Sequence, residues 1–186
     1  MKAVIFDLDG TLVDSAAAIC DNANVLMAEQ GWPLLDVKEA QRYIGNGARR
    51  FLELALQARD GAYDPATFET RLARLNHIYA NAPADANPRY PGVQQLLETL
   101  HQRDGVALGI CTNKPAAPTR VIVEAYGWAD MFGAVVGGDE LSERKPHPLP
   151  LRTVVERLQA DAAVYVGDSE VDAATAAAAQ IPFVLY

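Results

Sequence analysis

The chain has 186 residues, of which 50% are hydrophobic and 22% charged, a balance typical of a folded globular protein and not of a disordered one. Its 24 acidic and 16 basic residues give a net charge of −8, which argues against binding to nucleic acid or to an anionic membrane surface. No apolar run approaches the ~20 residues of a membrane span, and the N-terminus has neither a signal nor a transit pattern. Cys20 and Cys111 lack metal or redox spacing, so we expect two buried thiols and a cytoplasmic location.

The spacing of apolar residues changes twice along the chain. Residues 3–6 predict a buried strand, after which only helical spacing follows, centred on residues 23–28, 51–56 and 68–79. Residues 83–92 are rich in proline and predict a linker. Beyond the linker, helices at 94–103, 119–126, 149–158 and 171–179 alternate with strands at 106–111, 133–136, 163–166 and 182–186.

Such alternation predicts an α/β fold with a parallel sheet and right-handed crossovers. We therefore expect a Rossmann-like core made of residues 1–14 and 84–186. Residues 15–83 form a helical insertion after the first strand of that core.

Reactive side chains stand where several predicted strands end, which is the edge at which open α/β sheets bind their ligands. The residues in this position are Asp7, Asp9, Thr112, Asn113, Asp168 and, after a loop, Lys145. The three carboxylates would repel one another, and a hard divalent cation, typically Mg²⁺ beside phosphate, relieves this repulsion. The lysine adds positive charge, while the threonine and asparagine supply hydrogen-bond donors. This combination suits phosphoryl transfer, in which one carboxylate attacks phosphorus to form an aspartyl-phosphate and another protonates the leaving oxygen and then activates water.

Four segments resemble, in order and spacing, the four signatures of the haloacid dehalogenase superfamily of phosphohydrolases. They are residues 7–15 (DLDGTLVDS), 110–114 (ICTNK), 145–146 (KP) and 167–172 (GDSEVD). Within this superfamily the chain is most similar to phosphoglycolate phosphatases, through residues 44–48, 112–115 and 137–148. The resemblance spans nearly the whole chain and implies that the helical insertion is the cap domain of the family.

The resemblance implies a catalytic role for each matching residue. Asp7 is expected to be the nucleophile and Asp9 the general acid and base. Thr112 and Asn113 are expected to hold the phosphoryl oxygens, and Lys145 to stabilise the nucleophile and the phosphate.

The resemblance also implies a Mg²⁺ site. Its expected ligands are Asp7, the backbone carbonyl of Asp9, and Asp168, with Asp172 near or in the coordination shell. Asp172 has an alternative role, because it stands three residues after Ser169 and could complete a capping box there.

The insertion offers weaker candidates for substrate binding. Gly45-Asn46-Gly47 predicts either a turn between helices or a loop that closes over the substrate, which makes Gly47 a candidate. Arg49 could bind a substrate carboxylate. Arg50 follows it, but adjacent residues of a helix point about 100° apart, so we do not expect both arginines to face the site. A solvated surface position is the alternative for Arg49.

We predict a Mg²⁺-dependent phosphoric monoester hydrolase that acts on a small phosphorylated metabolite, with 2-phosphoglycolate as the best guess, and that is a monomer or a homodimer. The alternatives are a sugar-phosphate phosphatase or phosphomutase of the same fold, a signalling receiver module, and a binding protein on an inactive phosphatase fold. Members of the family usually continue beyond the position of Tyr186 with another strand and a helix, which we expect to be missing here.

Overall fold

The computed structural model describes residues 1–59 and 62–186, and its centre is a sheet of five parallel strands. The spatial order is β3-β2-β1-β4-β5, so the first strand lies in the middle of the sheet. The strands are β1 (Lys2–Phe6), β2 (Val106–Cys111), β3 (Phe132–Val136), β4 (Ala162–Gly167) and β5 (Phe183–Leu185). The predicted α/β fold with a parallel sheet is thereby confirmed.

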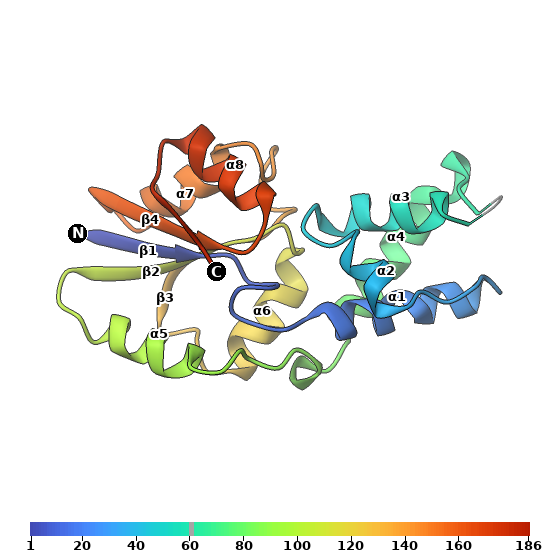
Figure 1. Ribbon diagram of the computed structural model, residues 1–186, viewed down its shortest axis with the longest axis horizontal. Helices are drawn as coiled ribbons and strands as arrows, with labels where there is room; N and C mark the ends of the chain where they lie inside the picture. The colour runs from blue at the N-terminus through green and yellow to red at the C-terminus, as the bar shows by residue number, and fades with distance from the viewer. Residues whose placement is uncertain (60–61) are drawn as a thin grey trace.

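Helices cover both faces of the sheet, with α5 and α6 on one face and α7 and α8 on the other (Figure 1). Successive residues of a strand point to opposite faces. Phe6 therefore packs with Leu97 of α5 and Ile122 of α6, whereas Ile5 packs with Val154 of α7. The bounds of these helices are α5 (Val93–His101), α6 (Ala116–Ala125), α7 (Leu149–Arg157) and α8 (Glu170–Ala179).

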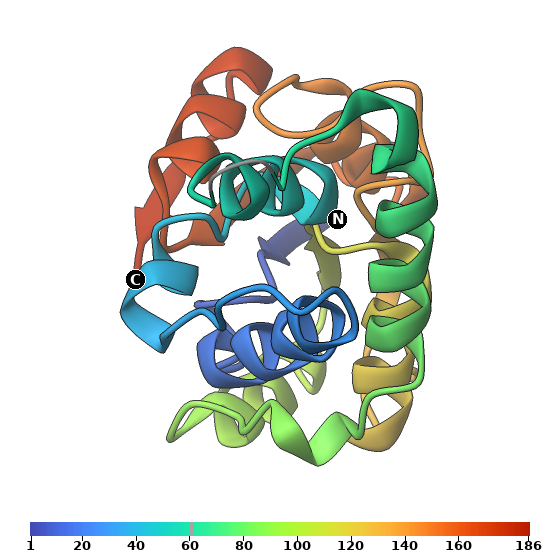
Figure 2. The same cartoon turned by 90° about the vertical axis from the view of Figure 1, so that its right-hand side faces the viewer.

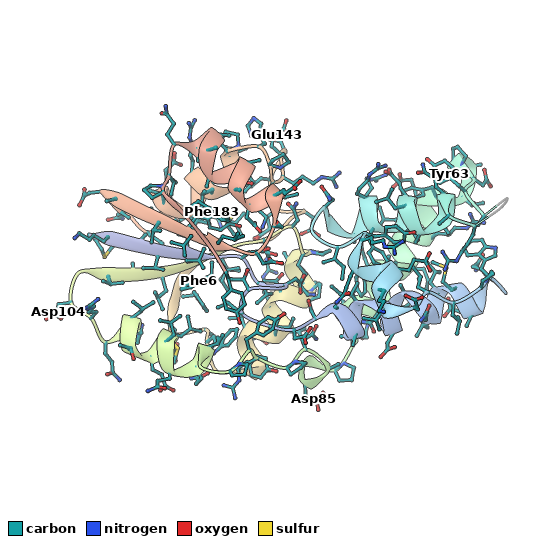
Figure 3. All side chains as sticks on the ribbon, in the orientation of Figure 1. Phe6, Tyr63, Asp85, Asp104, Glu143 and Phe183 are labelled. Atoms are coloured by element: carbon teal, nitrogen blue, oxygen red, sulfur yellow. The ribbon has the colours of Figure 1, made fainter. Side chains whose placement is uncertain are left out.

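The segment between β1 and α5 is helical and lies beyond the carboxyl ends of the strands (Figure 1). Figure 2, in which this segment faces the viewer, shows α1 and α3 in front of the strand ends. Figure 3 shows Tyr63 at the far end of the segment, and Asp104, which precedes β2, at the opposite end of the molecule. The helices of the segment are α1 (Ala16–Glu29), α2 (Val37–Gln41), α3 (Gly47–Gln57), α4 (Pro65–Ala80) and the short 3₁₀ helix η1 (Ala84–Ala86).

The helical insertion has a hydrophobic cluster of its own. Buried residues such as Leu26, Leu52 and Leu75 pack together from α1, α3 and α4. The two clusters on the faces of the sheet contain none of the described residues of the insertion. On this separate cluster we base our proposal that residues 15–83 form a cap domain and that the rest of the chain forms the core.

The two connections between core and insertion run side by side. Val13 pairs with Arg89 in an antiparallel bridge. Asp14 N donates to Pro88 O at 2.8 Å, and Tyr90 N donates to Leu12 O at 3.2 Å. The chain thus enters and leaves the insertion at one place.

Candidate active site

The carboxyl ends of the strands and the helical insertion enclose a cavity of about 210 Å³. The core contributes Asp7, Asp9, Thr112, Asn113, Lys114, Pro115, Asp168 and Ser169. The insertion contributes Ile19, Gln41, Ile44, Gly45, Gly47, Ala48 and Tyr79. The strand-end residues singled out from the sequence therefore gather in one place, with Lys145 directly behind them against Asp7.

Asp7 follows β1 at the bottom of this cavity and is only 6% exposed. Its backbone N–H continues the sheet by donating to Val166 O at 2.9 Å. Its Oδ1 lies 3.0 Å from Lys145 Nζ, yet it accepts no hydrogen bond from any described residue. Burial raises the pKa of Asp7 from 3.8 to about 7, with Lys145 opposing the rise and the carboxylates of Asp172 and Asp9 adding to it.

Lys145 is buried between two carboxylates. Its Nζ lies 3.0 Å from Asp7 Oδ1 and 2.7 Å from Asp172 Oδ1, and it donates to the Tyr165 hydroxyl at 2.9 Å. Burial alone lowers the pKa of an ammonium group, but Asp7 and Asp172 outweigh that effect and raise the pKa of Lys145. The Lys145 ammonium thus forms ion pairs with two carboxylates.

Asp172 is fully buried, and donors surround both of its oxygens. Oδ1 accepts from Lys145 Nζ and lies 2.7 Å from the Tyr165 hydroxyl, while Oδ2 accepts from the backbone N–H and the hydroxyl of Ser169. Burial opposes ionisation of Asp172, but Lys145 and these hydrogen bonds prevail and lower its pKa. The capping box that the sequence offered as the alternative role is present at the start of α8. The contact between Asp172 and Lys145 was not predicted, and it holds the Lys145 ammonium in place.

Three carboxylates could share a cation. Asp7, Asp168 and Asp172 each offer an oxygen, and these atoms lie within 4.8 Å of one another. Asp168 is exposed on the cavity side, accepts from Thr11 Oγ1 at 3.2 Å, and has its pKa raised first by partial burial and then by Asp172. Three acidic groups against one ammonium, together with an Asp7 Oδ1 that accepts no hydrogen bond from the described residues, fit a hard divalent cation such as Mg²⁺.

Gly10 makes room for this cluster. A Cβ atom at this position would lie 2.2 Å from Asp168 Oδ2, and its φ of +83° is in the left-handed region that favours glycine. Gly10, which follows Asp9 after β1, therefore lets the chain turn in close contact with the side chain of Asp168.

Asp9 has a partner that we did not predict. Its Oδ1 accepts from Lys114 Nζ at 2.9 Å, and Oδ2 lies at 3.3 Å from the same atom, with the two side chains only 13% and 10% exposed. The side chain of Asp9 lies outside the described group of three carboxylates that could hold a metal. Lys114 stands in the second family signature, but nothing in the local pattern showed that its side chain reaches across to the end of β1.

Thr112 and Asn113 follow β2, as predicted, and their side chains make different contacts. Thr112 lines the cavity, and its hydroxyl accepts from Lys114 N at 3.2 Å. The Asn113 side chain donates to Gly45 O at 2.9 Å and to Lys145 O at 3.1 Å, and it accepts from Lys145 N at 3.0 Å. These bonds occupy the side-chain amide, so Asn113 positions Lys145 and ties the insertion to the core instead of presenting that amide to a phosphate.

The two candidates on the insertion also differ in their positions. Gly47 lines the cavity with a φ of +80°, and a Cβ there would lie 3.1 Å from Asn113 O. Arg49, two residues further along α3, is turned away, because its guanidinium donates to both oxygens of Glu69 at 2.8 and 2.9 Å and lies 5.4 Å from the Phe68 ring. It is not among the described residues that line the cavity. The surface position that we gave as the alternative is thus the one that the structure shows.

The sequence model of the haloacid dehalogenase-like hydrolase family matches residues 1–180 of the chain. The chain belongs to this family. A phosphoglycolate phosphatase of Rhodospirillum rubrum is 46% identical over 99% of this chain and 78% of its own length. One of Cereibacter sphaeroides is 40% identical over the whole of this chain and 85% of its own length.

A solved structure gives the same result for the fold. A phosphoglycolate phosphatase predicted in Haemophilus somnus 129pt superposes with a TM-score of 0.91 at 28% identity, covering 100% of this chain and 84% of that one. The expected family and the expected enzyme class, a hydrolase, are therefore confirmed. Among the described helices, none is both long and apolar enough to cross a membrane.

Proposed function

We propose that this phosphoric monoester hydrolase cleaves 2-phosphoglycolate in a Mg²⁺-dependent reaction through an aspartyl-phosphate on Asp7. The observation that carries the proposal is the setting of Asp7, a buried carboxylate at the end of the central strand with Lys145 3.0 Å away and two further carboxylates close by. The substrate rests on the relatives, which are phosphoglycolate phosphatases at 46% and 40% identity. The cavity of about 210 Å³ suits a small substrate.

In the first half-reaction, an oxygen of Asp7 attacks phosphorus while the bond between phosphorus and the ester oxygen breaks. Lys145 keeps its positive charge in the folded protein and stabilises the charge that gathers around the attacked phosphate. Asp9 donates a proton to the departing oxygen, so glycolate leaves as the alcohol. Asp9 stands two residues after Asp7 on the cavity wall, which places an acid beside the nucleophile.

In the second half-reaction, Asp9 takes a proton from water, and the resulting hydroxide attacks the phosphorus of the aspartyl-phosphate. The bond between phosphorus and the Asp7 oxygen breaks, inorganic phosphate leaves, and the Asp7 carboxylate is regenerated. Asp7, Asp168 and the backbone carbonyl of Asp9 would hold Mg²⁺, which would supply the positive charge that lets a phosphate dianion approach a carboxylate.

The test measures release of inorganic phosphate from 2-phosphoglycolate and several sugar phosphates, with Mg²⁺ and with a chelator. We expect Mg²⁺-dependent release that is fastest from 2-phosphoglycolate, and loss of turnover in the folded Asp7→Asn variant. Faster release from a sugar phosphate would support the proposed phosphatase activity but would replace 2-phosphoglycolate as its substrate. Phosphate transfer without release would indicate a mutase, a long-lived phospho-aspartate would indicate a receiver module, and full activity in Asp7→Asn would rule out the proposed nucleophile.

A further inference from the structure

Among the described residues that line the cavity there is one cation, Lys114, and the proposed reaction does not explain its purpose. We infer that Lys114, assisted by the hydroxyl of Tyr79, binds the carboxylate of the substrate and thereby selects phosphoesters of small hydroxy acids. This inference rests on the proposed function, because it assigns the group that recognises the non-phosphate end of that substrate.

The chemistry of the substrate determines where its carboxylate must lie. In 2-phosphoglycolate a single methylene separates the ester oxygen from the carboxylate carbon. The general acid must contact that ester oxygen, so the substrate carboxylate lies within a few ångströms of the Asp9 side chain. Once Asp9 has given its proton to the departing oxygen it is a carboxylate again, and two anions this close need a cation between them. Lys114 Nζ already lies 2.9 Å from Asp9 Oδ1.

Lys114 has enough hydrogen-bond donors for both Asp9 and the carboxylate of the substrate. A lysine ammonium has three N–H donors, and the two oxygens of Asp9 engage at most two of them. The side chain is 10% exposed, so a bond made there is shielded from water and salt more than a surface ion pair is.

Two other described cations near the site are occupied, and a third, Arg144, lies beside Gly47 but is not among the described residues that line the cavity. Lys145 is shared by Asp7 and Asp172 and is not among the residues that line the cavity. Arg49 is held by both oxygens of Glu69, outside the cavity. The described lining from the insertion is uncharged, and the core side carries three carboxylates. An anionic substrate therefore meets one lining cation, which is Lys114.

Tyr79 supplies a second donor from the opposite wall. It lies on α4, and both it and Lys114 line the cavity at the strand ends and the small cavity beside it, so the two residues border the same space. Its hydroxyl makes no hydrogen bond to any described residue, and burial followed by the nearby Asp9 carboxylate raises its pKa, so it remains a protonated donor. A carboxylate held between them would join the insertion to the core.

The experiment compares two pairs of compounds that differ only in the carboxylate. The substrates are 2-phosphoglycolate and ethyl phosphate, and the non-hydrolysable ligands are 3-phosphonopropionate and propylphosphonate. The full chain is tested with Mg²⁺ as wild type, Lys114→Met, Lys114→Arg and Tyr79→Phe. Lys38→Met, which removes an exposed lysine on α2, is the matched control. Circular dichroism and thermal unfolding establish that each variant is folded.

We expect Lys114→Met to lower kcat/KM for 2-phosphoglycolate about 10- to 100-fold, mainly through KM, because it removes a charge-assisted hydrogen bond. For ethyl phosphate we expect a fall several times smaller. Binding of 3-phosphonopropionate should weaken by the same factor as kcat/KM for 2-phosphoglycolate, and binding of propylphosphonate much less. Lys114→Arg should restore part of the difference, Tyr79→Phe should lose a smaller part, and Lys38→Met should behave as wild type.

Equal losses for both substrates would show that Lys114 acts only through Asp9, and this would overturn the inference, as would no loss at all. In either case wild-type turnover of 2-phosphoglycolate would leave the proposed function standing. A wild type that hydrolyses ethyl phosphate at least as well as 2-phosphoglycolate would overturn both the substrate and its recognition.

Discussion

Replacing the proposed nucleophile, Asp7, should stabilise the metal-free protein while it abolishes activity. In Asp7→Asn the shape of the side chain stays, but one of three clustered negative charges is removed, and Lys145 keeps its contact with Asp172. The pKa of Asp7 rises from 3.8 to about 7 on folding. At ~1.4 kcal/mol per pKa unit, ionised Asp7 therefore costs the folded state up to about 4 kcal/mol, which the neutral asparagine avoids.

The sign of this effect depends on pH. Because burial raises the pKa of Asp7, its contribution to stability is complete below about pH 4 and is lost as the pH rises to about 7. The advantage of Asp7→Asn should therefore grow between pH 4 and pH 7 and stay constant above. Mg²⁺ should narrow the difference by binding the wild type, with a gain of about 2.7 kcal/mol at a concentration of 100 times Kd.

The assay is urea unfolding of the wild type and Asp7→Asn at pH 5 and pH 8, each with chelator and with Mg²⁺. We expect the variant to be the more stable protein at pH 8 in chelator, with a smaller difference at pH 5. A variant that is less stable than the wild type by more than about 1 kcal/mol at pH 8 in chelator would refute the reasoning, because it would mean that the Asp7 charge stabilises the metal-free fold.

Three further variants test the surroundings of the site. Asp172→Asn should lower the free energy of unfolding by about 3–5 kcal/mol, because it leaves Lys145 with one buried carboxylate fewer, and chemical denaturation measures this. Gly10→Ala should weaken Mg²⁺ binding about 10- to 100-fold by displacing Asp168, measured as the Mg²⁺ dependence of the melting temperature. Arg49→Ala should cost only about 0.2–1 kcal/mol of stability and leave KM within about twofold, because the ion pair is on the surface.

Different outcomes would contradict each of these expectations. Full stability in Asp172→Asn would show that its contact with Lys145 is energetically neutral. Unchanged Mg²⁺ binding in Gly10→Ala would place the metal away from Asp168. A large rise in KM in Arg49→Ala would mean that the arginine leaves Glu69 when the substrate binds.

Much of the fold could be predicted from the sequence because its strands are short apolar runs and most of its helices are long enough to show a repeat. The run at 106–111 coincides with β2, and the predicted strand at 163–166 differs from β4 by one residue at each end. The helix α2 was missed because its five residues make little more than one turn, too few to show a periodic pattern.

The site could be predicted only as far as strand ends determine it. Asp7 and Asp168 gather because the carboxyl ends of parallel strands share one edge. The pairing of Lys114 with Asp9 could not be predicted, since it joins residues that follow different strands through a flexible side chain whose direction depends on packing. Arg49 illustrates the same limit, because its partner Glu69 lies on another helix.

The antiparallel pairing of the two connections at Val13 and Arg89 has a consequence for how the chain is synthesised and diversified. β1 leaves the ribosome first, yet its neighbours in the sheet begin at Val106 and Ala162, so the insertion is complete before β1 can pair. The entropic free-energy cost of closing that long loop rises by only about 0.6 kcal/mol for each doubling of its length. An insertion whose ends already meet can therefore be lengthened, shortened or exchanged at little cost to the sheet, and new substrate preferences can be acquired without rebuilding the chemistry beneath them.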